Sequence, residues 1–173
     1  MPFLESTPLP PHLVQPLVYE NLMYGETHGI EMVANWKASS RWTLSPGYAL
    51  EQLHMHTEPG SADIQSGGFV EGGTPHHTAQ LRSHLDLRQD LSWETFTSFA
   101  NHLSNQGLST IERIPAYTRL DTGLTWKPKE GISISAFGQN LLMDHHVEFE
   151  DVFGSMQSSQ IKRSAYAKVN WRF

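Results

Sequence analysis

Residues 79–88 read AQLRSHLDLR, and this stretch decides what kind of fold the chain can form. Apolar side chains alternate with polar ones along it: Ala79, Leu81, Leu85 and Leu87 are interleaved with Gln80, Arg82, His84, Asp86 and Arg88. Successive side chains of a β-strand point to opposite faces of its sheet, so the pattern predicts a strand with one apolar and one charged face. Such a strand separates two very different media.

Similar alternation recurs on both sides of this stretch. We expect six more strands, within residues 25–37, 42–55, 93–102, 119–127, 132–142 and 164–173. In the second of these the apolar positions change phase at Leu53 and Met55, which we interpret as a bulge or as the exit of the strand.

The connections between these strands alternate in length. Short turns are expected at residues 38–40, 89–91 and 128–131, and long loops at residues 58–74, 103–115 and 143–161. This alternation is typical of membrane barrels, which have short periplasmic turns and longer outer loops, and whose strands have roughly 9 to 11 residues. The sequence therefore predicts an all-β fold, an antiparallel meander of about seven strands that forms a partial transmembrane β-barrel wall.

The first residues differ from the rest because they are rich in proline, which removes backbone donors and fixes φ. The prolines are Pro2, Pro8, Pro10, Pro11 and Pro16. We expect residues 1–23 to be the remnant of an extracellular loop and residues 24–173 to be C-terminal barrel strands. A spanning sheet must close, and bacterial single-chain barrels have even strand numbers from 8 upward. Seven strands without an export signal therefore predict a fragment of a larger barrel.

Composition narrows the function classes. The chain has 12 basic and 18 acidic residues, a net charge of −6, which argues against a nucleic-acid partner. It has no Cys, so disulfides and thiolate metal sites are excluded. No Ser-His-Asp order and no phosphate-binding glycine loop is evident, so we expect no enzyme and no cofactor.

Four segments resemble late barrel strands of TonB-dependent receptors. They are residues 21–31 (NLMYGETHGIE), 116–121 (AYTRLD), 137–142 (FGQNLL) with 146–149 (HVEF), and the closing strand 163–173 (RSAYAKVNWRF). Together they cover about Asn21 to Phe173. The resemblance implies a receptor in the bacterial outer membrane that imports a scarce extracellular ligand, often a ferric siderophore, with energy passed through TonB. It implies contacts with a plug domain and with TonB through the missing N-terminal part, and no catalysis.

Three histidine groups near the expected outer loop ends are candidate ligand-binding residues, because imidazole is a common transition-metal ligand. They are His54 and His56, His76 and His77, and His145 and His146. The alternative is that they are exposed loop histidines without the helical spacing that directs two rings at one ion, so we predict no metal site. Glu148 and Asp151 are candidates for an oxygen-rich site, or are simply solvated.

Five tryptophans are expected at the short-turn end of the sheet, where amphipathic rings favour the membrane interface: Trp36, Trp42, Trp93, Trp126 and Trp171. Ordinary core packing is the alternative. The final Phe173, with Trp171 and Val169 on its face, resembles the signal read by the outer-membrane assembly machinery. A terminal Phe by chance is the other interpretation.

Two other functions stay open from the residues alone: a small soluble or secreted β-barrel or sandwich that binds an apolar ligand, and a metal-binding β protein. A soluble barrel turns its apolar face inward, whereas a membrane wall turns it to the lipid bilayer. We therefore expect the polar residues to point to the concave, lumen side: Arg82, His84, Asp86, Arg88, Arg119, Asp121, Lys168, Asn170 and Arg172.

Overall fold

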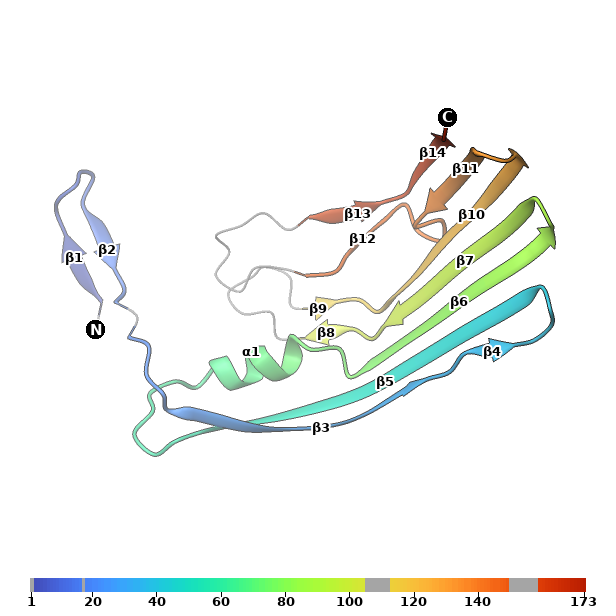
Figure 1. Ribbon diagram of the computed structural model, residues 1–173. Helices are drawn as coiled ribbons and strands as arrows, with labels where there is room; N and C mark the ends of the chain where they lie inside the picture. Colours follow the sequence, from blue (N-terminus) through green and yellow to red (C-terminus); the bar gives the residue numbers. More distant parts are fainter. Residues whose placement is uncertain (1, 17, 105–112, 150–158) are drawn as a thin grey trace.

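The computed structural model describes residues 2–16, 18–104, 113–149 and 159–173. Its main feature is one eight-stranded antiparallel sheet in the order β14-β11-β10-β7-β6-β5-β3, with the short β4 paired to β5 (Figure 1). The strands are β3 (Met23–Val33), β4 (Trp36–Lys37), β5 (Trp42–Thr57), β6 (His77–Arg88), β7 (Leu91–Ala100), β10 (Tyr117–Lys129), β11 (Ile132–Gln139) and β14 (Ser164–Trp171). Since β3 and β4 together form one crossing beside β5, the eight strands make seven crossings. The predicted antiparallel meander of about seven strands is confirmed.

Cross-strand register assigns every crossing to the same two faces of the sheet. Trp42 lies opposite Leu85, Leu85 opposite Trp93, and Trp93 opposite Leu124. Directly opposed residues share a face, so the alternating pattern of each strand is aligned with that of its neighbours. One face therefore carries the tryptophans with Leu81, Leu85 and Leu124, and the other carries Arg82, His84, Arg119 and Asp121.

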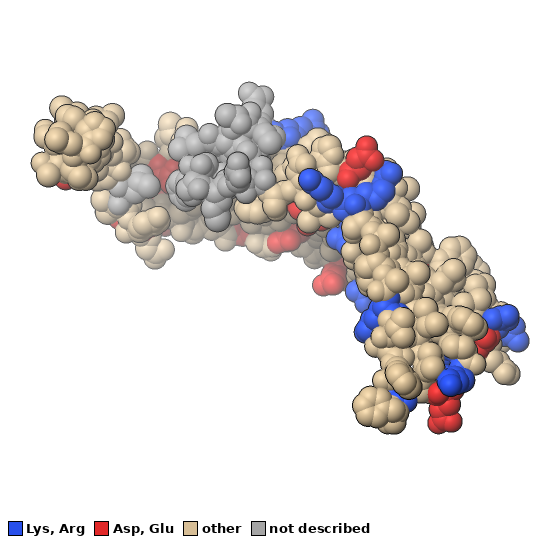
Figure 2. Space-filling view, turned by 90° about the horizontal axis from the view of Figure 1, so that it is seen from above, with Lys and Arg blue, Asp and Glu red and all other residues tan. Residues whose placement is uncertain are grey.

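The sheet is a curved single layer and not a sandwich. Figure 2 shows the chain bending into an arc. Among the described residues only Leu103 and Ile114 are buried apolar side chains, while Leu81, Leu124 and the tryptophans stay exposed on the outer face. A wall without a second layer leaves its apolar face for lipid, which favours the membrane interpretation over a soluble barrel. No helix among the described residues is long and apolar enough to cross a membrane.

All five tryptophans lie near the short-turn end of the sheet, as predicted. Trp42 begins β5, Trp126 lies near the end of β10, and Trp171 ends β14. Register places all five on the apolar face, because Trp36 pairs with Leu44 and Trp171 with Ile132. The turn between β10 and β11 is tighter than expected, since Pro128 and Lys129 extend β10 and only Glu130 and Gly131 form the loop, with Gly131 at φ 78°.

The expected long loops contain regular structure that the sequence analysis missed. Residues 58–74 include a short helix, α1 (Ser66–Gly72). Two loops begin and end with short strand pairs, β8 (Leu103–Ser104) with β9 (Arg113–Ile114), and β12 (His145–Val147) with β13 (Gln160–Lys162). Two boundaries also shift: β7 ends at Ala100 and not at residue 102, and Leu142 lies beyond the end of β11.

Both interpretations of the phase change near Leu53, a bulge and the exit of the strand, are wrong. β5 runs without a register shift along the whole of β3, from the pair Met23–Thr57 to the pair Val33–Gly47. The phase changes because α1 packs on the inner face of β5 beyond Leu50, where β6 no longer pairs with it. Leu53 and Met55 point to that face and are half-buried there, so the apolar side of the strand switches while its backbone stays regular.

The proline-rich beginning also differs from the expected loop. β1 (Phe3–Glu5) and β2 (His12–Val14) form a small two-stranded sheet, paired from Phe3–Val14 to Glu5–His12. All of its residues have exposed or half-exposed side chains. The prolines fall outside these strands, where a missing N–H group does not interrupt the pairing.

Candidate ligand-binding site

Helix α1 is held against the inner face of β5 at the outer end of the sheet. The backbone N–H of Met55 donates a 2.6 Å hydrogen bond to Glu71 Oε1, and Gly67 approaches the Met55 side chain closely. Asp63 Oδ1 accepts the backbone N–H groups of Gln65 and Ser66 at 3.0 and 2.9 Å at the start of the helix. Hydrogen bonds from Ser66, side chain first, and from Gln65 lower the pKa of Asp63.

A buried polar network closes the outer end of β10 and β11. Asn140, whose side chain has 0% exposure, adopts the left-handed conformation at φ 52°. Its backbone N–H donates to Asp121 Oδ1 at 2.9 Å, and its side-chain amide donates to the carbonyl of Ile161 at 3.0 Å. Arg119 holds Asp121 from the other side through two hydrogen bonds of 2.9 and 2.7 Å. Asn140 therefore joins the wall to the loop that begins at β12.

The same network positions a histidine and a carboxylate. His146 is 5% exposed, and its ring nitrogens lie 3.2 Å from Asn140 Oδ1 and 3.0 Å from Glu148 Oε1. Its ring stacks on Tyr117 with a centroid distance of 4.3 Å and an interplanar angle of 21°. Because both ring nitrogens are engaged, His146 orients Tyr117 and Glu148 and is not an open metal ligand.

Tyr117 and Glu148 form one side of a pocket of about 280 Å³ at the outer mouth. The pocket lies on the inner face of the sheet, because Tyr117 pairs with Ala100 on the same face as Arg119 and Asp121. It is lined by Phe69 and Gly73 of the α1 region, Pro75, Ala100, Asn101, Leu103, Ile114, Tyr117, Glu148 and Phe149. A concave, mostly apolar site with a few polar groups is the usual form of a small-molecule pocket.

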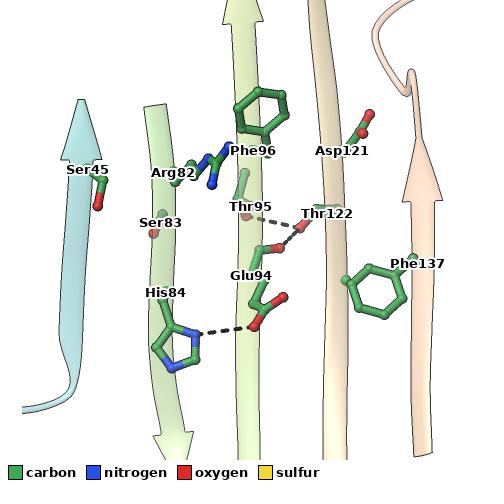
Figure 3. A pocket seen from close by; sticks show the side chains of 11 residues that line it. Ser45, Arg82, Ser83, His84, Glu94, Thr95, Phe96, Asp121, Thr122 and Phe137 are labelled. Atoms are coloured by element: carbon green, nitrogen blue, oxygen red, sulfur yellow. Dashed lines mark hydrogen bonds and ion pairs between the residues drawn. The ribbon is translucent and has the colours of Figure 1, made fainter. Parts of the chain in front are cut away.

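A second, more open hollow of about 470 Å³ lies on the inner wall (Figure 3). Arg82 lies over the Phe96 ring at 5.4 Å from its centroid, and the His84 ring nitrogens lie 3.4 Å from both Asp86 and Glu94. Phe137 extends across β10 above Gly123, where a Cβ atom would collide with its ring. Arg82, His84 and Asp121 confirm that the polar face of β6 and β10 lines the concave side. Arg88 is an exception, because a register shift after Asp86 places it opposite Leu91, which lies opposite Trp126 on the apolar face. The expectation that Arg88 faces the lumen is therefore wrong.

The structure does not bring the six candidate histidines together. His54 and His56 are exposed on β5 opposite Glu26 and Tyr24, on the face that continues the lipid-facing side. The two histidines are two residues apart because both face their cross-strand partners on β3. The ring centroids of His56 and Tyr24 are 5.3 Å apart.

The other candidates are dispersed as well. His77 bonds Tyr48 Oη at 2.7 Å on the outer face, His76 and His145 are exposed, and His146 is buried in the network. Among the described residues no group of three or more His, Asp or Glu side chains is arranged to hold a metal ion. Asp151, the partner expected for Glu148, lies outside the described residues.

The proposed C-terminal assembly signal lies on an open edge. Val169 and Trp171 occupy the apolar face of β14 and pair with Ile134 and Ile132, and the Phe173 ring contacts Trp171 edge-on at 6.2 Å. Within the part of the chain that the structure describes, β14 pairs only with β11. An unpaired strand edge presents a row of backbone donors and acceptors to another strand.

Sequence reasoning missed the mouth pocket because its residues come from four separate segments. Phe69 lies in the expected loop 58–74, and Tyr117 was recognised only as part of a strand. The signal that was available is Asn140: a polar residue after a strand, in the segment FGQNLL, is suited to the left-handed conformation that ends β11.

Comparison with known proteins agrees with this architecture. The family model "TonB dependent receptor-like, beta-barrel" matches residues 3–141. Similar solved structures include the ferric-catecholate import receptor Fiu from E. coli (TM-score 0.70, 16% identity, 87% of this chain and 22% of that chain). The siderophore receptor PiuA from Acinetobacter baumannii matches with a TM-score of 0.69 and 16% identity, over 85% of this chain and 22% of that chain. The ferric yersiniabactin uptake receptor FyuA from Yersinia pestis matches with a TM-score of 0.68 and 17% identity, over 88% of this chain and 24% of that chain. No curated relative matches the chain by sequence.

The family match covers most of the chain, and the structural matches show the same fold at low identity. The chain spans about a fifth to a quarter of the length of these receptors, 22% for Fiu and 24% for FyuA. Both the family and these structural neighbours are transport receptors and not enzymes. The chain therefore belongs to the TonB-dependent receptor β-barrel family and forms a part of an outer-membrane barrel wall.

Proposed function

We propose that this chain is part of a receptor that imports a scarce extracellular ligand, such as a ferric siderophore, across the outer membrane. The observation that carries the proposal is the pairing of a lipid-facing apolar wall with a pocket on its lumen side, at the end where the long loops lie. The pocket supplies a place to capture a ligand, and the polar inner wall supplies a wet interior for its passage.

The partners follow from the same reasoning. The inner hollow around Arg82 and Phe96 is suited to the polar surface of a plug domain, through which TonB delivers energy. The open edge of β14, with Val169, Trp171 and Phe173, is suited to capture by the outer-membrane assembly machinery. No catalytic chemistry is part of this proposal.

A ligand role for the exposed histidines remains a separate proposal. His54 and His56 lie on the face opposite the pocket, so they suit contacts at the barrel exterior. His76 and His145 are exposed, while His146 supports the pocket wall from behind.

Uptake measurements test the transport function. In the bacterium that carries the full-length gene, we expect its deletion to abolish accumulation of at least one ferric siderophore under iron limitation, and loss of TonB to have the same effect. Restoring the gene with Arg at position 81, on the lipid face, should not restore uptake, whereas the wild-type gene should. Unchanged accumulation of ferric catecholate, hydroxamate and carboxylate complexes in the deletion strain would reject an iron-uptake role.

A further inference from the structure

The walls of the mouth pocket are apolar except at one side. Leu103 and Ile114 are buried and form the floor, with Phe69, Pro75 and Phe149 around them. Tyr117 adds an aromatic ring whose orientation is fixed by stacking on His146. Flat rings packed against such walls gain both burial and favourable ring–ring contact, so the lining favours a flat apolar group.

The volume limits the size of that group. An apolar cavity of about 150 Å³ accommodates one benzene ring, so 280 Å³ offers space for about two fused rings. The pocket is therefore suited to one aromatic part of a ligand and not to a whole ferric siderophore.

The charge of the lining is negative. Glu148 is the only acidic or basic residue among the lining residues, and His146 Nε2 lies 3.0 Å from its Oε1. Two basic residues adjoin lining residues without lining the pocket themselves: the exposed Arg113, next to Ile114, and Arg119, whose guanidinium is bound to Asp121 through two hydrogen bonds. Among the described lining residues an anionic group meets a carboxylate and no Lys or Arg, which disfavours it.

The segment that surrounds the pocket has the same sign. Between Trp42 and Leu81 the chain contains no Lys or Arg, and four acidic residues: Glu51, Glu58, Asp63 and Glu71. All four belong to the outer part of β5, the α1 segment and the connections between β5 and β6. An excess of one charge around a cleft raises the local concentration of groups of the opposite charge.

We propose that the mouth pocket binds a flat, apolar group that is neutral or positively charged, and that it discriminates against anionic groups through Glu148. The proposal rests on the proposed function, because it defines the ligand chemistry of the same receptor. It separates this protein from a receptor whose pocket attracts a highly anionic ferric catecholate.

A series of naphthalene probes tests the charge preference on the purified full-length receptor. The probes are 2-naphthylmethylammonium, 2-naphthylmethanol and 2-naphthoate, which share one ring system and differ in charge at pH 7.5. Ligand-observed NMR gives their dissociation constants. Because an exposed ion pair contributes up to about 1 kcal/mol, which is about fivefold in affinity, we expect the cation to bind about fivefold more tightly than the anion.

Variants assign this preference to the pocket. Glu148→Gln preserves the shape of the side chain and should reduce the cation-to-anion ratio to less than about twofold. Glu58→Gln removes an equal charge outside the pocket lining and should leave the ratio near the wild-type value. Phe149→Ala should weaken all three probes by a similar factor, because it removes apolar contact without changing charge.

The outcomes separate this inference from the transport function. No binding of any probe, tighter binding of the anion, or a ratio that Glu148→Gln does not change would each overturn the charge preference. The probe titration needs no TonB and no energy source. TonB-dependent uptake without charge discrimination therefore rejects only the pocket inference, whereas discrimination without any iron uptake rejects only the proposed transport function.

Discussion

Replacing Leu81 by Arg tests the orientation of the wall and its depth in the membrane. Leu81 is 41% exposed on the apolar face, opposite Pro46 and Thr97. Leu85 lies on the same face but level with Trp42 and Trp93. Four residues of strand span about 14 Å, and a tilt near 45° reduces this to about 10 Å of depth. Since the apolar band is about 25 Å tall, Leu81 lies near its centre and Leu85 at its rim.

The expected destabilisation follows this difference in depth. Leu81→Arg should lower the free energy of unfolding by about 2–4 kcal/mol, and Leu85→Arg by about 0–1 kcal/mol, because Arg at the rim reaches the headgroups. Arg82→Leu, on the lumen face, should leave assembly intact. The measurement is the amount of heat-modifiable, folded full-length barrel in isolated outer membranes. Equal loss at positions 81 and 85, or a loss from Arg82→Leu as large as from Leu81→Arg, would refute the assigned facing and depth.

Three further perturbations test the outer end and the inner wall. Asn140→Ala should destabilise the loop that begins at β12 by about 1–3 kcal/mol, because it leaves the hydrogen-bond partners of the Asn140 side chain unsatisfied. Limited proteolysis between residues 141 and 163 should then be faster, and an unchanged cleavage rate would contradict the network. Gly123→Val should displace the Phe137 ring and reduce folded barrel more than Gly60→Val does, since a Cβ at Gly60 meets nothing within 4 Å although φ is 98° there. Because hydrogen bonds lower the pKa of Asp63, its carboxylate stabilises the start of α1 fully above pH 3.8, the ordinary pKa of Asp, and loses this effect as the pH falls through the folded pKa. Hydrogen exchange of residues 66–72, corrected for intrinsic rates, should therefore rise below the folded pKa in the wild type but not in Asp63→Ala.

Much of the wall could be predicted because its signal is local. In β6 the alternation assigns each residue up to Asp86 to its face, since Leu81 and Arg82 are adjacent in sequence and opposite in space. The tryptophan positions follow from the same counting, because a strand of known direction places Trp42 and Trp126 at the same end as the short turns. Lipid on one side and water on the other impose this pattern on every crossing.

The outer end was predicted less well because its order depends on contacts between distant segments. The phase change at Leu53 is typical of a bulge, but its cause is a helix that begins at Ser66 and packs against Met55. The proline-rich beginning looked like a loop, but residues between the prolines pair with one another. Local propensity does not contain these partners.

The sequence by itself determined the class of fold, the direction of each face and the end at which the aromatic residues gather, because alternation with period two is set by the strand geometry of each residue. Only the tertiary structure decided the site. Phe69, Tyr117 and Glu148 share a pocket because α1 folds against β5 and because Asn140 fixes the loop after β11 to Asp121 on β10. These contacts join residues far apart in the chain, so a pocket with one carboxylate and apolar walls exists only when the sheet register brings them together.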